Sequence, residues 1–79
     1  MVDNITADET LDAKGLSCPM PLLKTKKAMK GLGSGKILEV LGTDPGSKND
    51  MPGWCEKEGH EFLGTKDESD FFRMYLRKK

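Results

Sequence analysis

The spacing of apolar and polar residues divides the first half of the chain into three predicted elements. Residues 10–14 predict a short strand. Residues 19–32 have the apolar spacing of an amphipathic helix, which the glycines within residues 31–35 end. Residues 36–42 are mostly apolar and predict a buried strand. The first half therefore has the order strand, helix, strand.

The second half begins with a turn and a shorter predicted helix. The turn signal at residues 43–46 precedes Asp50, which we predict to be the N-cap of this helix. Met51 and Pro52 open the helix, because proline is favoured in a first turn, and Gly59 ends it.

Two further strands complete the pattern, at residues 61–66 and 71–78, with a turn at residues 67–70. The order βαβαββ predicts an α+β fold, a two-layer α/β sandwich with two helices on one face of a four-stranded mixed sheet. We expect residues 1–79 to form a single domain, with residues 1–8 as a flexible tail.

The charge balance narrows the function classes. Lys and Arg together number 13, as do Asp and Glu, so the formal net charge is zero. This balance argues against bulk electrostatic capture of nucleic acid. No apolar run has membrane-spanning length, and the acidic N-terminus lacks the apolar core of a signal peptide. We therefore expect a cytoplasmic protein with reduced thiols and no membrane partner.

The sequence offers no pattern of a metal or cofactor site. Cys18, Cys55 and the single histidine, His60, do not have the spacing of zinc ligands, and no Cys/His catalytic pair is indicated. We expect a structural role for His60. No glycine-rich loop opens a helix in the way that phosphate binding requires. We predict no metal and no cofactor.

Helical spacing divides the first helix into a core face and an exposed face. The core face is predicted to carry Leu22, Thr25, Met29 and Leu32.

Met20 and Leu23 fall outside that face, near Lys24 and Lys27. Single apolar residues on a surface are common, but their position beside Cys18 favours a docking patch for a partner protein. The helix lysines fit a solvated face, which we favour, attraction of an acidic partner, or support of a sulfur anion on Cys18; they are Lys24, Lys26, Lys27 and Lys30.

Cys18 is the residue with the clearest potential for chemistry. We predict that it is the N-cap of the first helix, where the helix dipole favours the nucleophilic thiolate. Pro19 and Pro21 have no backbone N–H, so the amides of Met20 and Leu22 are the first-turn donors that could support a sulfur anion.

The second thiol, Cys55, is predicted to be buried and unreactive. It lies within the second helix, where Met51, Trp54 and Cys55 form the apolar side. A single activated cysteine without a base or an oxyanion site suits thiol exchange better than hydrolysis. Cys18 could accept a sulfur atom from one persulfide and pass it to another acceptor.

The last strand supports a rival hypothesis. Its inward face is predicted to carry Phe72, Met74 and Leu76. Its outward face carries an interleaved aromatic and basic set, Phe71, Arg73, Tyr75 and Arg77. Such a set can bind RNA, although a solvated face is commoner, and with zero net charge we do not favour direct nucleic-acid binding.

Residues 11–22 resemble the signature of the TusA/SirA-like sulfurtransferase family, whose hallmark is Cys-Pro-x-Pro at the start of the first helix. The similarity continues in order through residues 43–47, 50–52, 54–55 and 59–61. The resemblance implies a small sulfur-carrier protein that holds sulfane sulfur as a persulfide on Cys18.

The same resemblance implies two classes of protein partner. The donor would be a cysteine desulfurase or a rhodanese, and the acceptor a relay protein of the DsrE type. The implied pathways include thiolation of tRNA wobble uridine, molybdenum cofactor assembly and sulfur oxidation, and a non-catalytic regulatory role is an alternative. We expect a monomer, because a carrier must pass between partners.

Met20 departs from relatives that have an acidic residue between the two prolines. An apolar side chain there changes the expected partner contact, which counts against the tRNA assignment more than against the transfer chemistry. Residues 24–27 and 44–51 look closer to relatives in sulfur-oxidising bacteria. The resemblance therefore favours sulfur oxidation or trafficking.

Overall fold

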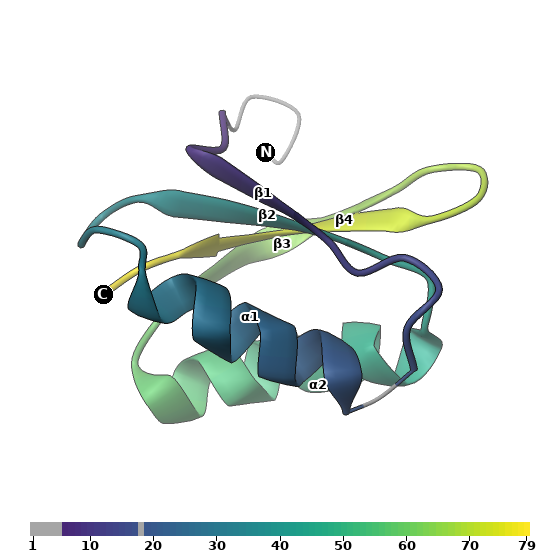
Figure 1. Ribbon diagram of the computed structural model, residues 1–79, viewed down its shortest axis with the longest axis horizontal. Coiled ribbons are helices and arrows are strands. Elements are labelled where there is room, and N and C mark those ends of the chain that lie inside the picture. The colour runs from purple at the N-terminus through teal and green to yellow at the C-terminus, as the bar shows by residue number, and fades with distance from the viewer. Residues whose placement is uncertain (1–5, 18) are drawn as a thin grey trace.

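The computed structural model describes residues 6–17 and 19–79. In these residues the sheet strands and the helices alternate in the predicted order βαβαββ (Figure 1). Their bounds are β1 Glu9–Asp12, α1 Met20–Lys30, β2 Ile37–Gly42, α2 Pro45–Glu58, β3 Glu61–Asp67 and β4 Phe72–Arg77. Both helices lie on one side of the sheet, which confirms the predicted two-layer α+β fold.

The sheet of the described residues is mixed, with strand order β1-β2-β4-β3. β1 is parallel to β2, whereas β4 runs antiparallel to both β2 and β3. A parallel neighbour requires a crossover connection, and α1 makes that crossover between β1 and β2. Because α2 makes the equivalent crossover from β2 to β3, both helices begin at the same end of the molecule (Figure 1).

The core lies between the sheet and the two helices. Leu38, Val40, Met74 and Leu76 from the sheet are at most 1% exposed. From the helices Met29, Met51 and Cys55 are at most 2% exposed.

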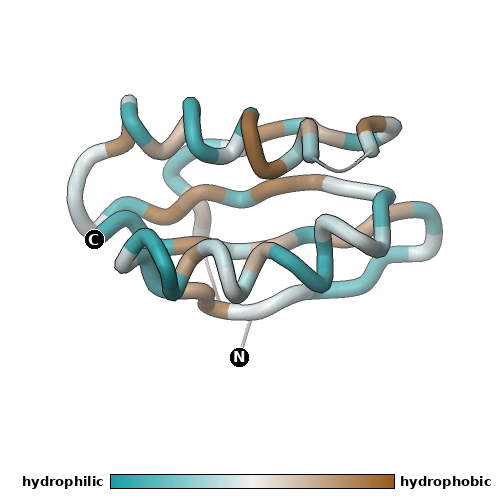
Figure 2. Tube along the Cα trace, turned by 90° about the horizontal axis from the view of Figure 1, so that it is seen from below, coloured by the Kyte–Doolittle hydropathy of each residue, from teal (hydrophilic) through white to brown (hydrophobic). Residues whose placement is uncertain are grey.

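Hydrophobic and hydrophilic stretches alternate along both helices (Figure 2), as amphipathic helices on one side of a sheet require. Thr25 and Met29 of the predicted core face are buried, Leu32 just beyond α1 is 8% exposed, and Leu22 packs against the core.

The start of α2 differs from the prediction by several residues. Asp44, not Asp50, is the N-cap: its carboxylate accepts hydrogen bonds from the Ser47 amide and hydroxyl, each at 3.0 Å. Pro45 occupies the first turn, where a missing N–H costs nothing. The segment predicted as a turn is therefore the start of the helix, and Asp44 is its capping residue.

Pro52 consequently lies inside α2 instead of opening it. An internal proline removes one helical hydrogen bond. Ser47, Met51 and Cys55 follow one another at four-residue intervals and are at most 1% exposed. Burial of this stripe holds the helix continuous through the proline, and the sequence pattern alone does not show that the stripe is buried.

The other boundaries differ by at most two residues from those predicted, as at β1, which spans Glu9–Asp12 instead of residues 10–14. Asp8, the last residue of the expected tail, is already held to β2. Its amide donates to the Ile37 carbonyl at 2.8 Å, and its carboxylate accepts from the Ile37 amide at 2.8 Å. Residues 1–5 of that expected tail lie outside the described residues.

Candidate functional site

The Cys-Pro-Met-Pro segment joins the loop after β1 to α1. Cys18 itself lies outside the described residues, whereas its neighbours Ser17 and Pro19 are both exposed. Pro21, two residues further on, is buried, a contribution to the core that the predicted helix face did not include. The buried Pro21 anchors the beginning of α1 to the rest of the molecule.

The capping arrangement at this point differs from the prediction. The N-cap of α1 is Pro19 and not Cys18, and no side chain caps the helix among the described residues. The Met20 amide, expected to be available to the sulfur, donates to the Ser17 carbonyl at 2.9 Å. The Leu23 amide donates to the Pro19 carbonyl at 3.1 Å. Of the two predicted donors, Leu22 is therefore the one that remains a candidate.

The helix dipoles make this end of the molecule favourable for an anion. The N-termini of α1 and α2 lie at the same end (Figure 1), and neither helix has an acidic residue in its first turn. Each N-terminus is equivalent to about half a positive charge. A thiolate or a persulfide anion at the start of α1 would meet no carboxylate from the first turn of α1, whereas the N-terminus of α2 is already capped by the Asp44 carboxylate.

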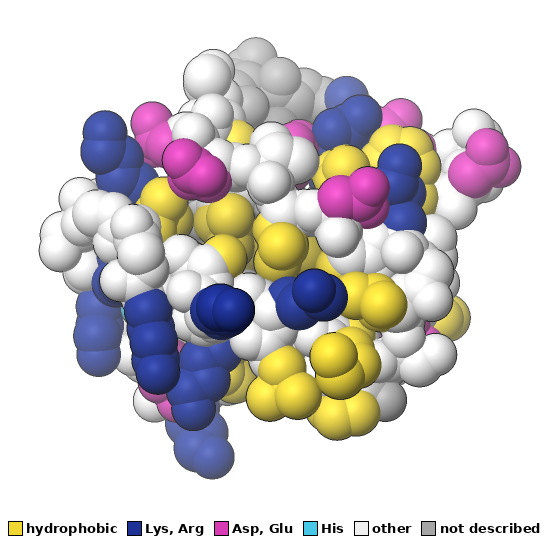
Figure 3. Space-filling view, viewed as in Figure 1, with side chains coloured by type: hydrophobic (Ala, Val, Ile, Leu, Met, Phe, Trp, Pro, Cys, Tyr) yellow, Lys and Arg dark blue, Asp and Glu magenta, His cyan; other side chains and the backbone are white. Residues whose placement is uncertain are grey.

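Two large apolar side chains are exposed next to this segment, as predicted. Met20 is 44% exposed and Leu23 is 54% exposed. Lys24 and Lys27 are exposed beside them. We call these four residues the α1 patch. Figure 3 shows hydrophobic side chains gathered over the beginning of α1, whereas Lys and Arg side chains gather toward the other end of the helix.

The α1 patch continues into a groove between α1 and the edge strand β1. The groove has a volume of about 460 Å³. Leu11, Ala28 and Leu38 contribute to its apolar lining, and the α1 patch contributes Lys24 and Lys27. The groove lies along the middle and the end of α1, and the sequence pattern did not indicate it.

Cys55 is the buried thiol that the sequence predicted. Its side chain is fully buried in the core beneath α2. Burial raises the pKa of this thiol from its ordinary 9.0 to about 12. Cys55 therefore stays protonated and inaccessible at neutral pH, and cannot act as a nucleophile there.

The raised pKa of Cys55 predicts a loss of stability at alkaline pH. Because the folded protein favours the neutral thiol, this contribution is complete below about pH 9 and is lost as the pH rises toward 12. Burial and the Glu39 hydrogen bond raise the pKa of Tyr75 from 10.0 to about 12, which acts in the same direction. The free energy of unfolding, measured by urea denaturation between about pH 9 and pH 12, should show this decrease. In Cys55→Ala the free energy of unfolding should fall less steeply with pH. An equal slope in this variant would contradict the assignment.

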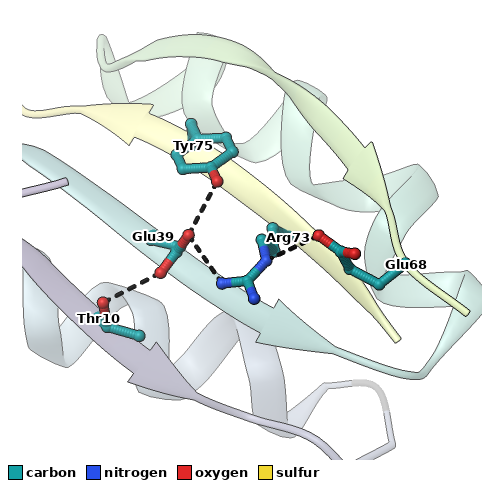
Figure 4. Close-up of polar contacts among 5 residues, drawn as sticks. All are labelled: Thr10, Glu39, Glu68, Arg73 and Tyr75. Carbon is teal, nitrogen blue, oxygen red and sulfur yellow. Dashed lines mark hydrogen bonds and ion pairs between the residues drawn. The ribbon is translucent and has the colours of Figure 1, made fainter. Parts of the chain in front are cut away.

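The outer face of the sheet is a closed network and not a free basic surface. Glu39 on β2 accepts hydrogen bonds from Tyr75 at 2.8 Å and from Arg73 and Thr10 at 3.1 Å each (Figure 4). Arg73 also donates to Glu68 at 3.0 Å. Burial acts to raise the pKa of Glu39, but these hydrogen bonds outweigh it and lower the pKa below its ordinary value.

This network weighs against the RNA-binding hypothesis. Tyr75 is only 5% exposed, although it lies on the outward face of β4. Arg73 is paired with Glu39 and Glu68, and Arg77 is 3.2 Å from Glu61. The cations that would contact phosphate are thus neutralised by carboxylates of the same sheet and its connecting turn. The sequence pattern missed Glu39 because its partners are far away in the chain.

His60 has a structural environment. Its Nδ1 accepts a hydrogen bond from the Lys79 amide at 3.3 Å, and its ring lies 5.6 Å from the Trp54 ring. Burial and the charges of Lys78 and Lys79 lower its pKa, so the ring is neutral at physiological pH. The described residues contain no group of three His, Cys, Asp or Glu side chains that could hold a metal ion.

Comparisons with known proteins agree with this architecture. No helix among the described residues has both the length and the apolar character that crossing a bilayer requires. Residues 9–78 match the family described as Sulfurtransferase TusA. The chain is 51% identical to YrkI of Bacillus subtilis over 91% of its length and 96% of that protein.

It is 39% identical to the sulfur carrier protein TusA of Allochromatium vinosum, over 90% of this chain and 93% of that protein. The crystal structure of a SirA-like protein from Desulfitobacterium hafniense superimposes with a TM-score of 0.72 at 28% identity, covering 87% of this chain and 95% of the other. The chain therefore belongs to the TusA family of sulfurtransferases, the family of the sulfur carrier proteins.

Proposed function

We propose that this protein carries sulfane sulfur as a persulfide on Cys18 and delivers it to an acceptor protein. The observation that carries the proposal is the contrast between the two thiols of a TusA-family chain. Cys55 is buried in the core with a raised pKa, whereas Cys18 lies in the sequence between two exposed residues and directly before Pro19, the N-cap of α1.

The transfer needs only thiol exchange. The Cys18 thiolate attacks the outer sulfur of a donor persulfide, a new S–S bond forms, and the bond to the donor sulfur breaks. The donor cysteine leaves as a thiolate, and Cys18 now holds the persulfide. An acceptor thiolate repeats the step on the outer sulfur of Cys18. Each step conserves the number of S–S bonds, so neither an external oxidant nor a cofactor is required.

The proposed partners follow from the family and from the α1 patch. A cysteine desulfurase or a rhodanese would supply the sulfur, and a DsrE-type protein would receive it. Met20 and Leu23 would contact the partner through apolar surface. We assign the carrier to sulfur oxidation or sulfur trafficking, because residues 24–27 and 44–51 look closer to relatives in sulfur-oxidising bacteria and Met20 replaces the acidic residue of some relatives. Relay to tRNA wobble-uridine thiolation is the alternative.

Peptide mass mapping tests the proposed function. After incubation of the wild-type protein with a sulfane-sulfur donor, we expect the peptide containing Cys18 to gain one sulfur atom and the peptide containing Cys55 to gain none. Brief alkylation of the folded protein before digestion would keep the added sulfur on the cysteine that received it. Sulfur found on Cys55, or on neither cysteine, would count against the carrier mechanism.

Substitution in the α1 patch separates docking from chemistry. We expect Leu23→Glu to reduce sulfur transfer from a protein donor by about tenfold, since a buried apolar contact is worth roughly 1.5 kcal/mol or more. Loading from a small polysulfide should stay unchanged, because it needs no docking surface. If both rates fall together, the substitution has altered the thiol itself and the patch has no separate docking role.

A further inference from the structure

The ends of the two helices enclose a recess that the proposed sulfur transfer does not use. It has a volume of about 180 Å³ and lies between the last turns of α1, the last turns of α2 and the residues after β4. Its lining includes Lys26, Lys30, Trp54, His60, Lys78 and Lys79. On α1 the lining begins at Lys26, six residues or about 9 Å beyond Met20, so the recess lies toward the C-terminal end of this helix.

The lysines of this recess are unlike the other basic residues of the chain. Lys26, Lys30 and Lys79 form no ion pair with any carboxylate in residues 6–17 and 19–79, whereas Arg73 and Arg77 are paired. Figure 3 shows Lys and Arg side chains gathered at this end of the molecule. The balanced net charge of the chain therefore conceals an uneven distribution.

The nearby negative charges do not cancel this excess. Glu58 is the carboxylate in the lining, and each helix C-terminus contributes about half a negative charge. The Lys78 ammonium donates to the carbonyls of Met29 and Leu32, which satisfies the end of α1. Lys26, Lys30 and Lys79 remain as charges that face solvent around the recess.

The other wall of the recess is aromatic. The rings of Trp54 and His60 have centroids 5.6 Å apart and are tilted by 39°. The His60 Nδ1 accepts the Lys79 amide, so in the neutral ring Nε2 holds the proton and is a hydrogen-bond donor. Burial and the charges of Lys78 and Lys79 lower the His60 pKa, whereas Glu58 opposes this effect. Two neutral rings, tilted to each other, thus lie beside a group of cations.

We propose that this recess binds a nucleotide, either free or as one unit of an RNA strand. A nucleotide has the two parts that the recess matches: a flat base for Trp54 and a phosphate for Lys26, Lys30 and Lys79. The volume corresponds to about six water molecules, which is enough for one base, and the phosphate would lie against the solvent-facing lysines at the rim of the recess. This site is independent of sulfur loading on Cys18.

Trp54 is the single tryptophan of the chain, so its fluorescence reports directly on the recess. We expect saturable quenching by adenosine monophosphate or by a short oligoadenylate RNA, and much weaker quenching by adenosine, which lacks the phosphate. Saturation by the mononucleotide would identify a free nucleotide as sufficient. Saturation by the RNA alone would identify the strand as the ligand. Calorimetry would confirm each affinity without optical absorption by the ligand.

Two double variants of α1 are matched for comparison. The first pair is Lys26→Ala with Lys30→Ala at the recess, and the second is Lys24→Ala with Lys27→Ala away from it. The first pair should weaken nucleotide affinity about tenfold or more and reduce its salt dependence, whereas the second should change the affinity less than about twofold. Cys18→Ser should bind as the wild type does. The proposal would be overturned if both double variants lost the same nucleotide affinity, or if no saturable binding were found. Equal competition by polyglutamate would also overturn it, and would indicate an acidic protein partner instead.

Discussion

Serine at position 18 is expected to abolish sulfur loading, while Cys55→Ala loads as the wild type does. The oxygen of serine is a much weaker nucleophile at neutral pH than a thiolate, and it cannot form a persulfide. Cys55 cannot replace Cys18, because its thiol is fully buried and its pKa is raised to about 12. After incubation, Cys18→Ser should therefore hold no more sulfur than the unincubated protein, and a merely partial decrease in loading is not expected.

Intact-mass measurement after incubation with a sulfane-sulfur donor checks this result for each variant. A circular dichroism spectrum of Cys18→Ser controls for folding, and we expect it to match the wild type because the neighbours of residue 18 are exposed. Loading of Cys18→Ser at the wild-type level would refute the carrier mechanism. A purely regulatory protein would instead keep its partner binding and its output in this variant.

Glu39→Ala is expected to lower the free energy of unfolding by about 3 kcal/mol, a large share of the roughly 5–15 kcal/mol typical of a small domain. The Glu39 side chain is 13% exposed and accepts three hydrogen bonds, from Thr10, Arg73 and Tyr75. Alanine would leave the buried Tyr75 hydroxyl without its acceptor and would leave Arg73 with Glu68 alone. Urea denaturation measures the change.

Glu61→Ala is the matched control on the same sheet. Its ion pair with Arg77 joins side chains that are 59% and 48% exposed, so its loss should cost below about 1 kcal/mol. Protonation of Glu39 at low pH should lower the free energy of unfolding, as the Glu39→Ala substitution does. Because the folded protein lowers the Glu39 pKa, this stability is present above the ordinary value of 4.5 and is lost as the pH falls through the lowered pKa. Equal losses for Glu39→Ala and Glu61→Ala would show that the network adds no stability of its own.

Much of the fold was predictable, because it depends on patterns that are local in the chain. The period of apolar residues located α1 and the strands, and helical spacing placed Met20 and Leu23 on the surface. The start of α2 was predicted wrongly. Asp44 and Asp50 both precede a proline by one or two residues, and local propensity cannot decide between two plausible caps.

The candidate site was predictable in its residues but not in its hydrogen bonds. The motif and the helical spacing identified Cys18 and the exposed apolar residues beside it. They placed the N-cap one residue too early and left the Met20 amide free, whereas that amide is bonded to Ser17. A hydrogen bond in a first turn depends on the path of the preceding loop, which the sequence pattern does not specify.

The sequence by itself determined the order of elements, the family signature around Cys18 and the burial of Cys55. These depend on short-range periodicity and on residues that are neighbours in the chain. Only the tertiary structure joined Glu39 to Tyr75 and Arg73, which are more than 30 residues away, and thereby neutralised the outer face of the sheet. It alone brought Trp54, Lys30 and Lys79 around one recess. The physical reason is that both arrangements depend on strand register and helix packing, which arise when distant segments bury their apolar faces together.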